Sequence, residues 1–198
     1  MVPRLAMLSK LEEYRRISKI DEIGRRYFAM NAFDGILTMI GVLMGGFIGG
    51  IKDSRIVLYT GMATCVAMGV SGFWGAYVTE AAERKHDMHE LEQAMLRDMS
   101  KTTQARAARF AVIVVSLIDG LSPLVAGILV VLPFFFTHLW GDITISYIAS
   151  LAIALVMLFV LGAFLAKVAK ENVFRSGIRM LIAGLVSVAL SFLLNLRK

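Results

Sequence analysis

Long uncharged tracts constrain the fold of this chain more than any other feature. Residues 56–79, 120–141 and 143–166 contain no Asp, Glu, Lys or Arg, and residues 27–51 are interrupted only by Asp34. A membrane-spanning helix needs roughly 20 mostly apolar residues, so each tract is long enough to cross a bilayer. The sequence therefore predicts an integral membrane protein.

A fifth tract, residues 180–196, reaches the same length once Ile178 and the snorkelling side chain of Arg179 are included. We predict an all-α fold with five transmembrane helices, at about residues 29–51, 56–80, 108–133, 143–166 and 176–196. The composition agrees, because 58% of the residues are apolar and 18% are charged. Soluble domains have about 45–50% apolar and about 25% charged residues.

Basic residues are distributed unevenly among the segments that flank the spans. Seven Lys and Arg residues precede the first span, six lie between Glu80 and Phe110, and four lie in residues 167–179. The loop of residues 134–142 carries none. Because basic loops stay in the cytoplasm, we expect a multi-pass protein with a cytoplasmic N-terminus and a C-terminus on the opposite side.

The net charge of +6 does not indicate a nucleic-acid partner, because Lys and Arg flank the spans rather than forming a basic face with exposed aromatic residues. The single cysteine, Cys65, excludes an intramolecular disulfide and a cysteine metal cluster within one chain. No pattern pairs a nucleophile with a base, and no Gly-rich phosphate loop is present. We therefore expect that the protein is not an enzyme and holds no prosthetic group. The lipid bilayer is expected to surround most of it.

Residues 1–28 are predicted to form an amphipathic helix on the cytoplasmic surface, ahead of a five-span domain over residues 29–198. Its apolar residues recur at intervals near three or a multiple of three, among many charged residues: Leu8, Leu11, Ile17, Ile20 and Ile23. Such a helix binds anionic headgroups or packs on a partner helix.

Two carboxylates fall within predicted spans, where an ionisable residue costs at least about 2.5–3.5 kcal/mol and is a functional candidate by default. Asp34 lies about six residues, or ~9 Å of helix rise, beyond the Arg25–Arg26 pair and its aromatic neighbours. Asp119 lies ~15 Å beyond Arg109, near the midplane. The alternative is that each carboxyl is protonated or bonded to a neighbouring helix.

Oxygen and thioether groups surround Asp34 in the sequence. Asn31 and Met39 flank it in the first span, and the second span supplies Met68. This mixture suits Fe²⁺ or Mn²⁺ better than Mg²⁺ or Ca²⁺, which prefer oxygen alone. We therefore place Asp34, Met68, Asp119, Asn31 and Met39 in a transport pathway, although methionine also fills ordinary apolar helices.

An acidic row begins where the second span ends, in a cytoplasmic helical segment over residues 81–105. Four carboxylates at positions 0, 3, 7 and 10 share roughly an 80° arc of a helix: Glu80, Glu83, Asp87 and Glu90. A divalent cation would relieve their mutual repulsion, and His86 and His89 add nitrogen ligands. The alternative is a solvated charged helix.

Glycines repeat every four residues in the first span, at Gly41, Gly45 and Gly49. Such a ridge allows close helix packing, either within one chain or between two chains. Because five spans form a small and odd-numbered bundle, we favour a homodimer.

Two segments resemble the first two spans of the vacuolar iron transporter family. They are NAFDGILTMIGVLMGG at residues 31–46 and AMGVSGFWGAYVTE at residues 67–80. The likeness continues through the Pro-containing third span and RSGIRMLIAG at residues 175–184, so it covers most of the chain. The Asp-Gly and Met-Gly elements are its specific part.

The resemblance implies a five-span homodimer that exchanges protons for Fe²⁺ or Mn²⁺ and moves the metal out of the cytoplasm. Asp34 matches the first-span aspartate of the family's metal pathway, and Met68 matches its second-span methionine. Glu80, Glu83 and Glu90 match the start of its metal-collecting acidic region. Only about 29 residues separate the second and third spans here, so we do not expect a complete cytoplasmic metal-binding domain.

The sequence thus predicts a proton-coupled exporter of Fe²⁺ or Mn²⁺, with divalent metal ions and protons as its partners. The alternative is a membrane-embedded metal-binding sensor or scaffold without transport activity. A third possibility is transport of a different substrate.

Overall fold

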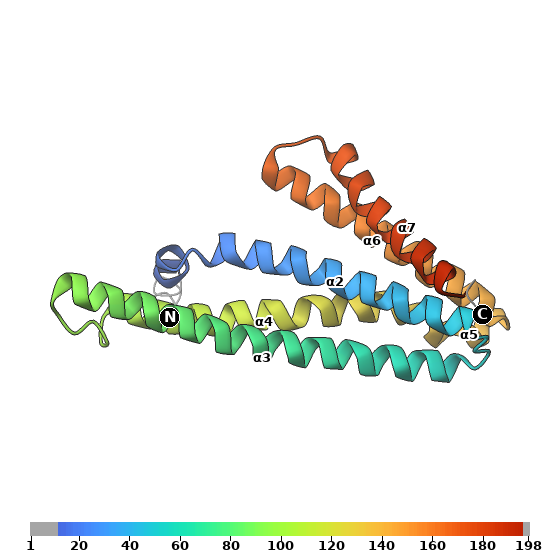
Figure 1. Cartoon of the computed structure of the whole chain (residues 1–198), viewed down its shortest axis with the longest axis horizontal. Helices are drawn as coiled ribbons and strands as arrows, with labels where there is room; N and C mark the ends of the chain where they lie inside the picture. The colour runs from blue at the N-terminus through green and yellow to red at the C-terminus, as the bar shows by residue number, and fades with distance from the viewer. Residues whose placement is uncertain (1–11, 196–198) are drawn as a thin grey trace, which may run out of the picture. The chain divides into compact units, whose positions relative to one another are not determined.

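A computed structural model describes residues 12–195, with side chains up to Leu193, and no residue in this range lies in a strand. The helices, in chain order, are α2 (Ile20–Ile48), α3 (Ser54–Met95), α4 (Thr103–Val131), the 3-10 helix η1 (Leu132–Phe136), α5 (Thr137–Trp140), α6 (Ile143–Ala169) and α7 (Val173–Asn195) (Figure 1). The predicted all-α fold is confirmed for this part of the chain.

Five helical stretches in the described range are long and apolar enough to cross a membrane, as predicted. They are Ile20–Ile48, Ser54–Met95, Thr103–Trp140, Ile143–Ala169 and Val173–Leu193. The 42 residues of α3 extend over ~63 Å, about twice the thickness of the apolar layer. The last turns of α3 therefore continue beyond the membrane.

The chain before α2 is helical at residues 12–17 and turns at Ser18 and Lys19. Lys19 has a positive φ of 51°, which ends this helix before α2 begins at Ile20. Residues 20–28 are therefore continuous with the first span. Residues 1–11, which include Leu8 and Leu11 of the predicted surface helix, lie outside the described part, and that surface helix stays a prediction.

The described residues divide into two compact units. The first contains residues 12–28 and 70–121, and therefore the start of α2, the later part of α3 and most of α4. The second contains residues 29–69 and 122–195. In the first unit, Tyr14 packs on Phe110 with ring centroids 6.1 Å apart.

The core of the second unit is an apolar stripe of α2 packed against α4 and α6. Its largest fully buried side chains are Ile36, Met39, Ile40, Leu43, Met44, Val130, Val131 and Leu158. The 3.6-residue period of a helix explains this stripe, since positions 36, 39, 40, 43 and 44 share one face. Tyr147 extends the core by packing on Phe134 and donating its hydroxyl to the Ile51 carbonyl at 3.2 Å.

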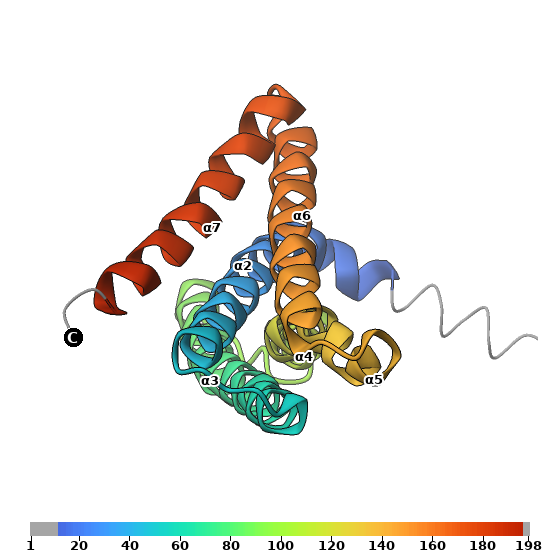
Figure 2. The same cartoon turned by 90° about the vertical axis from the view of Figure 1, so that its right-hand side faces the viewer.

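Local signals set both ends of α6. At its start, Thr144 N–H donates to Asp142 Oδ1 at 2.8 Å, which satisfies an unpaired helix donor and lowers the pKa of Asp142. The cap is therefore present at neutral pH and is lost as the pH falls through that lowered pKa. At its end, Lys170 adopts the left-handed conformation, and the chain turns into α7. Figure 2 shows α6 and α7 meeting at this connection and diverging beyond it.

Gly162 allows α6 and α7 to approach closely near the connection. A Cβ at this position would lie 2.6 Å from the Ser176 carbonyl oxygen and 2.9 Å from Gly177 Cα. Both atoms belong to the backbone and cannot move aside cheaply.

We predict that Gly162→Ala destabilises the protein by about 1–3 kcal/mol, the usual cost of overpacking, and lowers its Tm in detergent. Gly75→Ala is the matched control, because a Cβ at Gly75 meets nothing within 4 Å. It should leave the Tm unchanged or raise it, since Ala favours a helix over Gly. Equal Tm values for the two variants would contradict this packing.

Candidate functional site

Asp34 lies on an exposed face of α2 in the second unit, together with the glycine ridge. Asp34, Thr38, Gly41 and Gly45 are all exposed, and their spacing confines them to roughly a 60° arc of the helix. A Cβ at Gly41 or Gly45 would meet nothing within 4 Å in the described part of the chain. Within the described part of the second unit, nothing packs on the ridge at these two positions.

Met39 and Met68 face the interior of the second unit. Met39 is fully buried, roughly 140° around α2 from Asp34, and its Sδ lies 3.8 Å from Cys65 Sγ. A Cβ at Gly127 of α4 would lie 2.5 Å from Cys65 Sγ and 3.5 Å from Met68 Cε. The sulfur-bearing side chains thus share a packed region against α4, which spacing within single helices did not predict.

Asn31 and Asp119 complete the predicted pathway residues. Asn31 is half-buried in α2, about one turn before Asp34. Asp119 belongs to the first unit and is only 7% exposed. Asp119 interacts electrostatically with Tyr27. The backbone of α3 approaches it at Gly72, where an added Cβ would lie 3.0 Å from the Asp119 carbonyl oxygen. The interior position of Asp119 therefore depends on a glycine in the neighbouring helix.

Glu80 forms a polar cluster that joins α2 and α3 in the first unit. Tyr27 donates its hydroxyl to Glu80 Oε1 at 3.0 Å, and Arg84 Nε lies 3.5 Å from Glu80 Oε2. Arg84 also donates to the Ser18 carbonyl at 3.5 Å. The Glu80 side chain is only 12% exposed, so this carboxylate is compensated inside the protein rather than solvated. No local sequence pattern indicates this contact, because Tyr27 and Glu80 are 53 residues apart in the chain.

The rest of the acidic row differs from Glu80, because Glu83, Asp87 and Glu90 are exposed. His86 Nε2 lies 3.4 Å from Glu90 Oε1, and His89 Nε2 lies 3.0 Å from Gln93 Nε2. Between residues 12 and 195, no three His, Cys, Asp or Glu side chains are grouped closely enough to hold a metal ion. The metal-gathering role of this row stays a prediction.

We predict that Glu80→Gln lowers the Tm in detergent, because it leaves the Arg84 guanidinium, whose side chain is only 18% exposed, without its carboxylate. Removing one member of a buried ion pair costs up to about 3–5 kcal/mol. Glu83→Gln removes the same charge from an exposed neighbour and should leave the Tm unchanged. If both variants have the same Tm as the parent, the cluster does not stabilise the protein.

Comparison with known proteins agrees with this architecture. The sequence model of the VIT family matches residues 26–111 and 91–195. An uncharacterized protein of Methanocaldococcus jannaschii is 32% identical over 172 residues, covering 85% of this chain and 86% of the relative. The two family matches extend over all five candidate spans. The chain therefore belongs to the VIT family, the vacuolar iron transporters, whose members carry metal ions across membranes.

Proposed function

We propose that this protein is a proton-coupled transporter that exports Fe²⁺ or Mn²⁺ from the cytoplasm. The observation that carries the proposal is Asp34, a carboxylate on an uncovered face of a span in a member of a metal-transport family. A carboxylate facing hydrocarbon costs several kcal/mol, so this face needs a partner or a polar path. A divalent cation in that path would stabilise the ionised form.

A second copy of the chain is the partner we propose for this face. Gly41 and Gly45 share the face with Asp34 and leave the α2 backbone accessible, which suits close packing of two α2 helices. A two-fold axis along this ridge would bring two Asp34 carboxylates together. A homodimer would therefore supply the pair of carboxylate ligands that the described part of one chain does not assemble.

Met68 is the thioether that the family resemblance assigns to the same pathway, although its side chain packs in the interior of the second unit and Asp34 is exposed. A soft sulfur ligand beside oxygen ligands favours Fe²⁺ or Mn²⁺ over Mg²⁺ and Ca²⁺. Because Met68 is only half-buried in its contact with α4, a rotamer change of this flexible side chain can expose its sulfur. Met39, which is fully buried, instead supports the packing behind it.

A carboxylate ligand inside a span offers a general route to proton coupling. A carboxyl group in an apolar span is most stable when it is neutral, and it must ionise to bind a cation. Metal binding therefore releases protons, and metal release takes them up again. The exposed Glu83, Asp87 and Glu90, on the part of α3 that continues beyond the membrane, would raise the local concentration of cations at the cytoplasmic entrance.

We predict that Asp34→Asn abolishes uptake of Fe²⁺ and Mn²⁺ into proteoliposomes, because the amide cannot ionise. Asp53→Asn is the matched control, since Asp53 is an exposed loop residue whose carboxylate accepts the Arg55 N–H at 2.9 Å. The control should transport at the parent rate. Undiminished uptake by Asp34→Asn would refute the pathway. Metal that binds without flux in the parent would instead favour a sensor or scaffold.

We predict that Gly45→Cys, in a Cys65→Ala background, forms an intermolecular disulfide in membranes, because the two α2 ridges meet at the proposed axis. Val156→Cys is the control, because Val156 is 61% exposed on α6 and lies outside the ridge. Non-reducing gels would show a covalent dimer for the ridge variant alone. A monomer for both variants, with oxidant present, would argue against this dimer face.

A further inference from the structure

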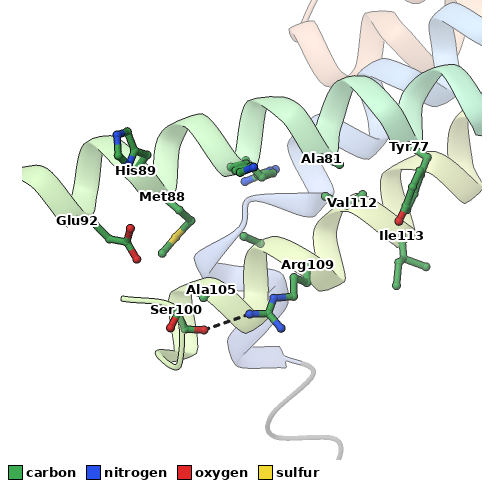
Figure 3. A pocket seen from close by; sticks show the side chains of 13 residues that line it. Tyr77, Ala81, Met88, His89, Glu92, Ser100, Ala105, Arg109, Val112 and Ile113 are labelled. Carbon is green, nitrogen blue, oxygen red and sulfur yellow. Dashed lines mark hydrogen bonds between the residues drawn. The ribbon is translucent and has the colours of Figure 1, made fainter. Parts of the chain in front are cut away.

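A pocket of about 680 Å³ lies in the first unit, between the later part of α3 and the start of α4 (Figure 3). The α3 residues that line it are spaced along one helix face from Tyr77 to Glu92, over a rise of ~22 Å. Small residues of α4, Ala105 and Ala108, leave the space open on the other side. Neither Asp34 nor Met68 lines this pocket, and the transport proposal does not use it.

The lining of the pocket changes along its length. One end is formed by Tyr77, Val112 and Ile113, which belong to the uncharged parts of the second and third spans. The other end reaches His89 and Glu92, on the part of α3 beyond the uncharged tract. The pocket thus extends from the apolar part of the two spans to the charged part of α3, which the positive-inside rule places on the cytoplasmic side.

Three cations line the middle of the pocket, against one carboxylate. Arg84 is already paired with Glu80, but Arg109 donates only to the neutral Ser100 carbonyl, at 3.1 Å. Lys85 makes no ion pair or hydrogen bond with any described residue. The single acid, Glu92, accepts the Met99 N–H at 3.0 Å. The pocket is therefore lined by two exposed cations, Lys85 and Arg109, that have no carboxylate partner among the described residues.

We propose that this pocket binds the headgroup of an anionic phospholipid from the cytoplasmic leaflet. Its phosphate would lie between Lys85 and Arg109, and its acyl chains would follow Tyr77, Val112 and Ile113 into the bilayer. A basic site at the membrane surface attracts anionic lipid, and a volume near 680 Å³ is in the usual range for a ligand pocket. A free anion would satisfy the two cations but would leave the apolar end unused, so we favour the lipid.

The test is native mass spectrometry of the full-length protein titrated in detergent with phosphatidylglycerol or phosphatidylcholine. Lys85→Gln/Arg109→Gln should weaken phosphatidylglycerol binding roughly 25-fold, at about fivefold for each charge removed. The matched control is Lys101→Gln/Arg106→Gln, which removes two exposed cations from the same cytoplasmic segment outside the pocket. Arg106 donates to the Lys101 carbonyl at 3.4 Å, much as Arg109 does to Ser100. The affinity of the control variant for phosphatidylglycerol should lie within about twofold of that of the parent.

A second variant tests the cavity itself without changing its charge. Ala108→Phe fills the apolar side of the pocket and should also weaken phosphatidylglycerol binding, while leaving phosphatidylcholine binding unchanged. If the pocket and control double variants lose phosphatidylglycerol binding equally, the lipid is attracted by the surface charge in general, and the proposal is overturned. Displacement of the lipid by millimolar inorganic phosphate would overturn it in favour of a free-anion site. This test is independent of the proposed transport function, because it measures the mass of bound lipid. A protein that transports no metal could still bind lipid in this pocket.

Discussion

The free-energy cost of placing a charge in hydrocarbon governs this structure. It keeps Asp, Glu, Lys and Arg out of the long tracts that become α3, α4 and α6 within the membrane. It also means that each carboxylate inside a span must be hidden, paired or used. The two carboxylates within the spans, Asp34 and Asp119, differ in their surroundings, and the proposed function depends on that difference.

Asp119 is hidden. It is almost completely buried in the first unit, close enough to Tyr27 for an electrostatic interaction, and α3 approaches it at Gly72, where no side chain intervenes. Asp34, in contrast, is exposed on α2 and shares its face with two uncovered glycines. A buried carboxylate is satisfied within one chain, whereas an exposed one in a span requires a second chain or a bound cation. The proposed function therefore gives the transport role to Asp34, and the pathway role of Asp119 stays a prediction.

Local sequence patterns predicted the helices well, because length and apolarity decide whether a segment spans a membrane. The same patterns placed Asp34 and the glycine ridge on α2, since a helix has a fixed period. They could not reveal the contact of Tyr27 with Glu80, because helix packing joins residues 53 positions apart. They also grouped Glu80 with Glu83, Asp87 and Glu90, although only Glu80 turns inward, toward Arg84. The pocket between α3 and α4 was equally hidden from the sequence, because its basic residues come from two helices.

The proposed function requires metal and protons to cross the membrane in opposite directions through one protein. It is tested most directly by recording internal pH and metal content together in proteoliposomes loaded with a weakly buffered solution, with no pH gradient at the start. For a proton-coupled exchanger we expect that external Fe²⁺ or Mn²⁺ enters while the interior becomes alkaline, in a fixed ratio of protons to metal. Metal entry at constant internal pH, with the membrane potential clamped, would contradict it.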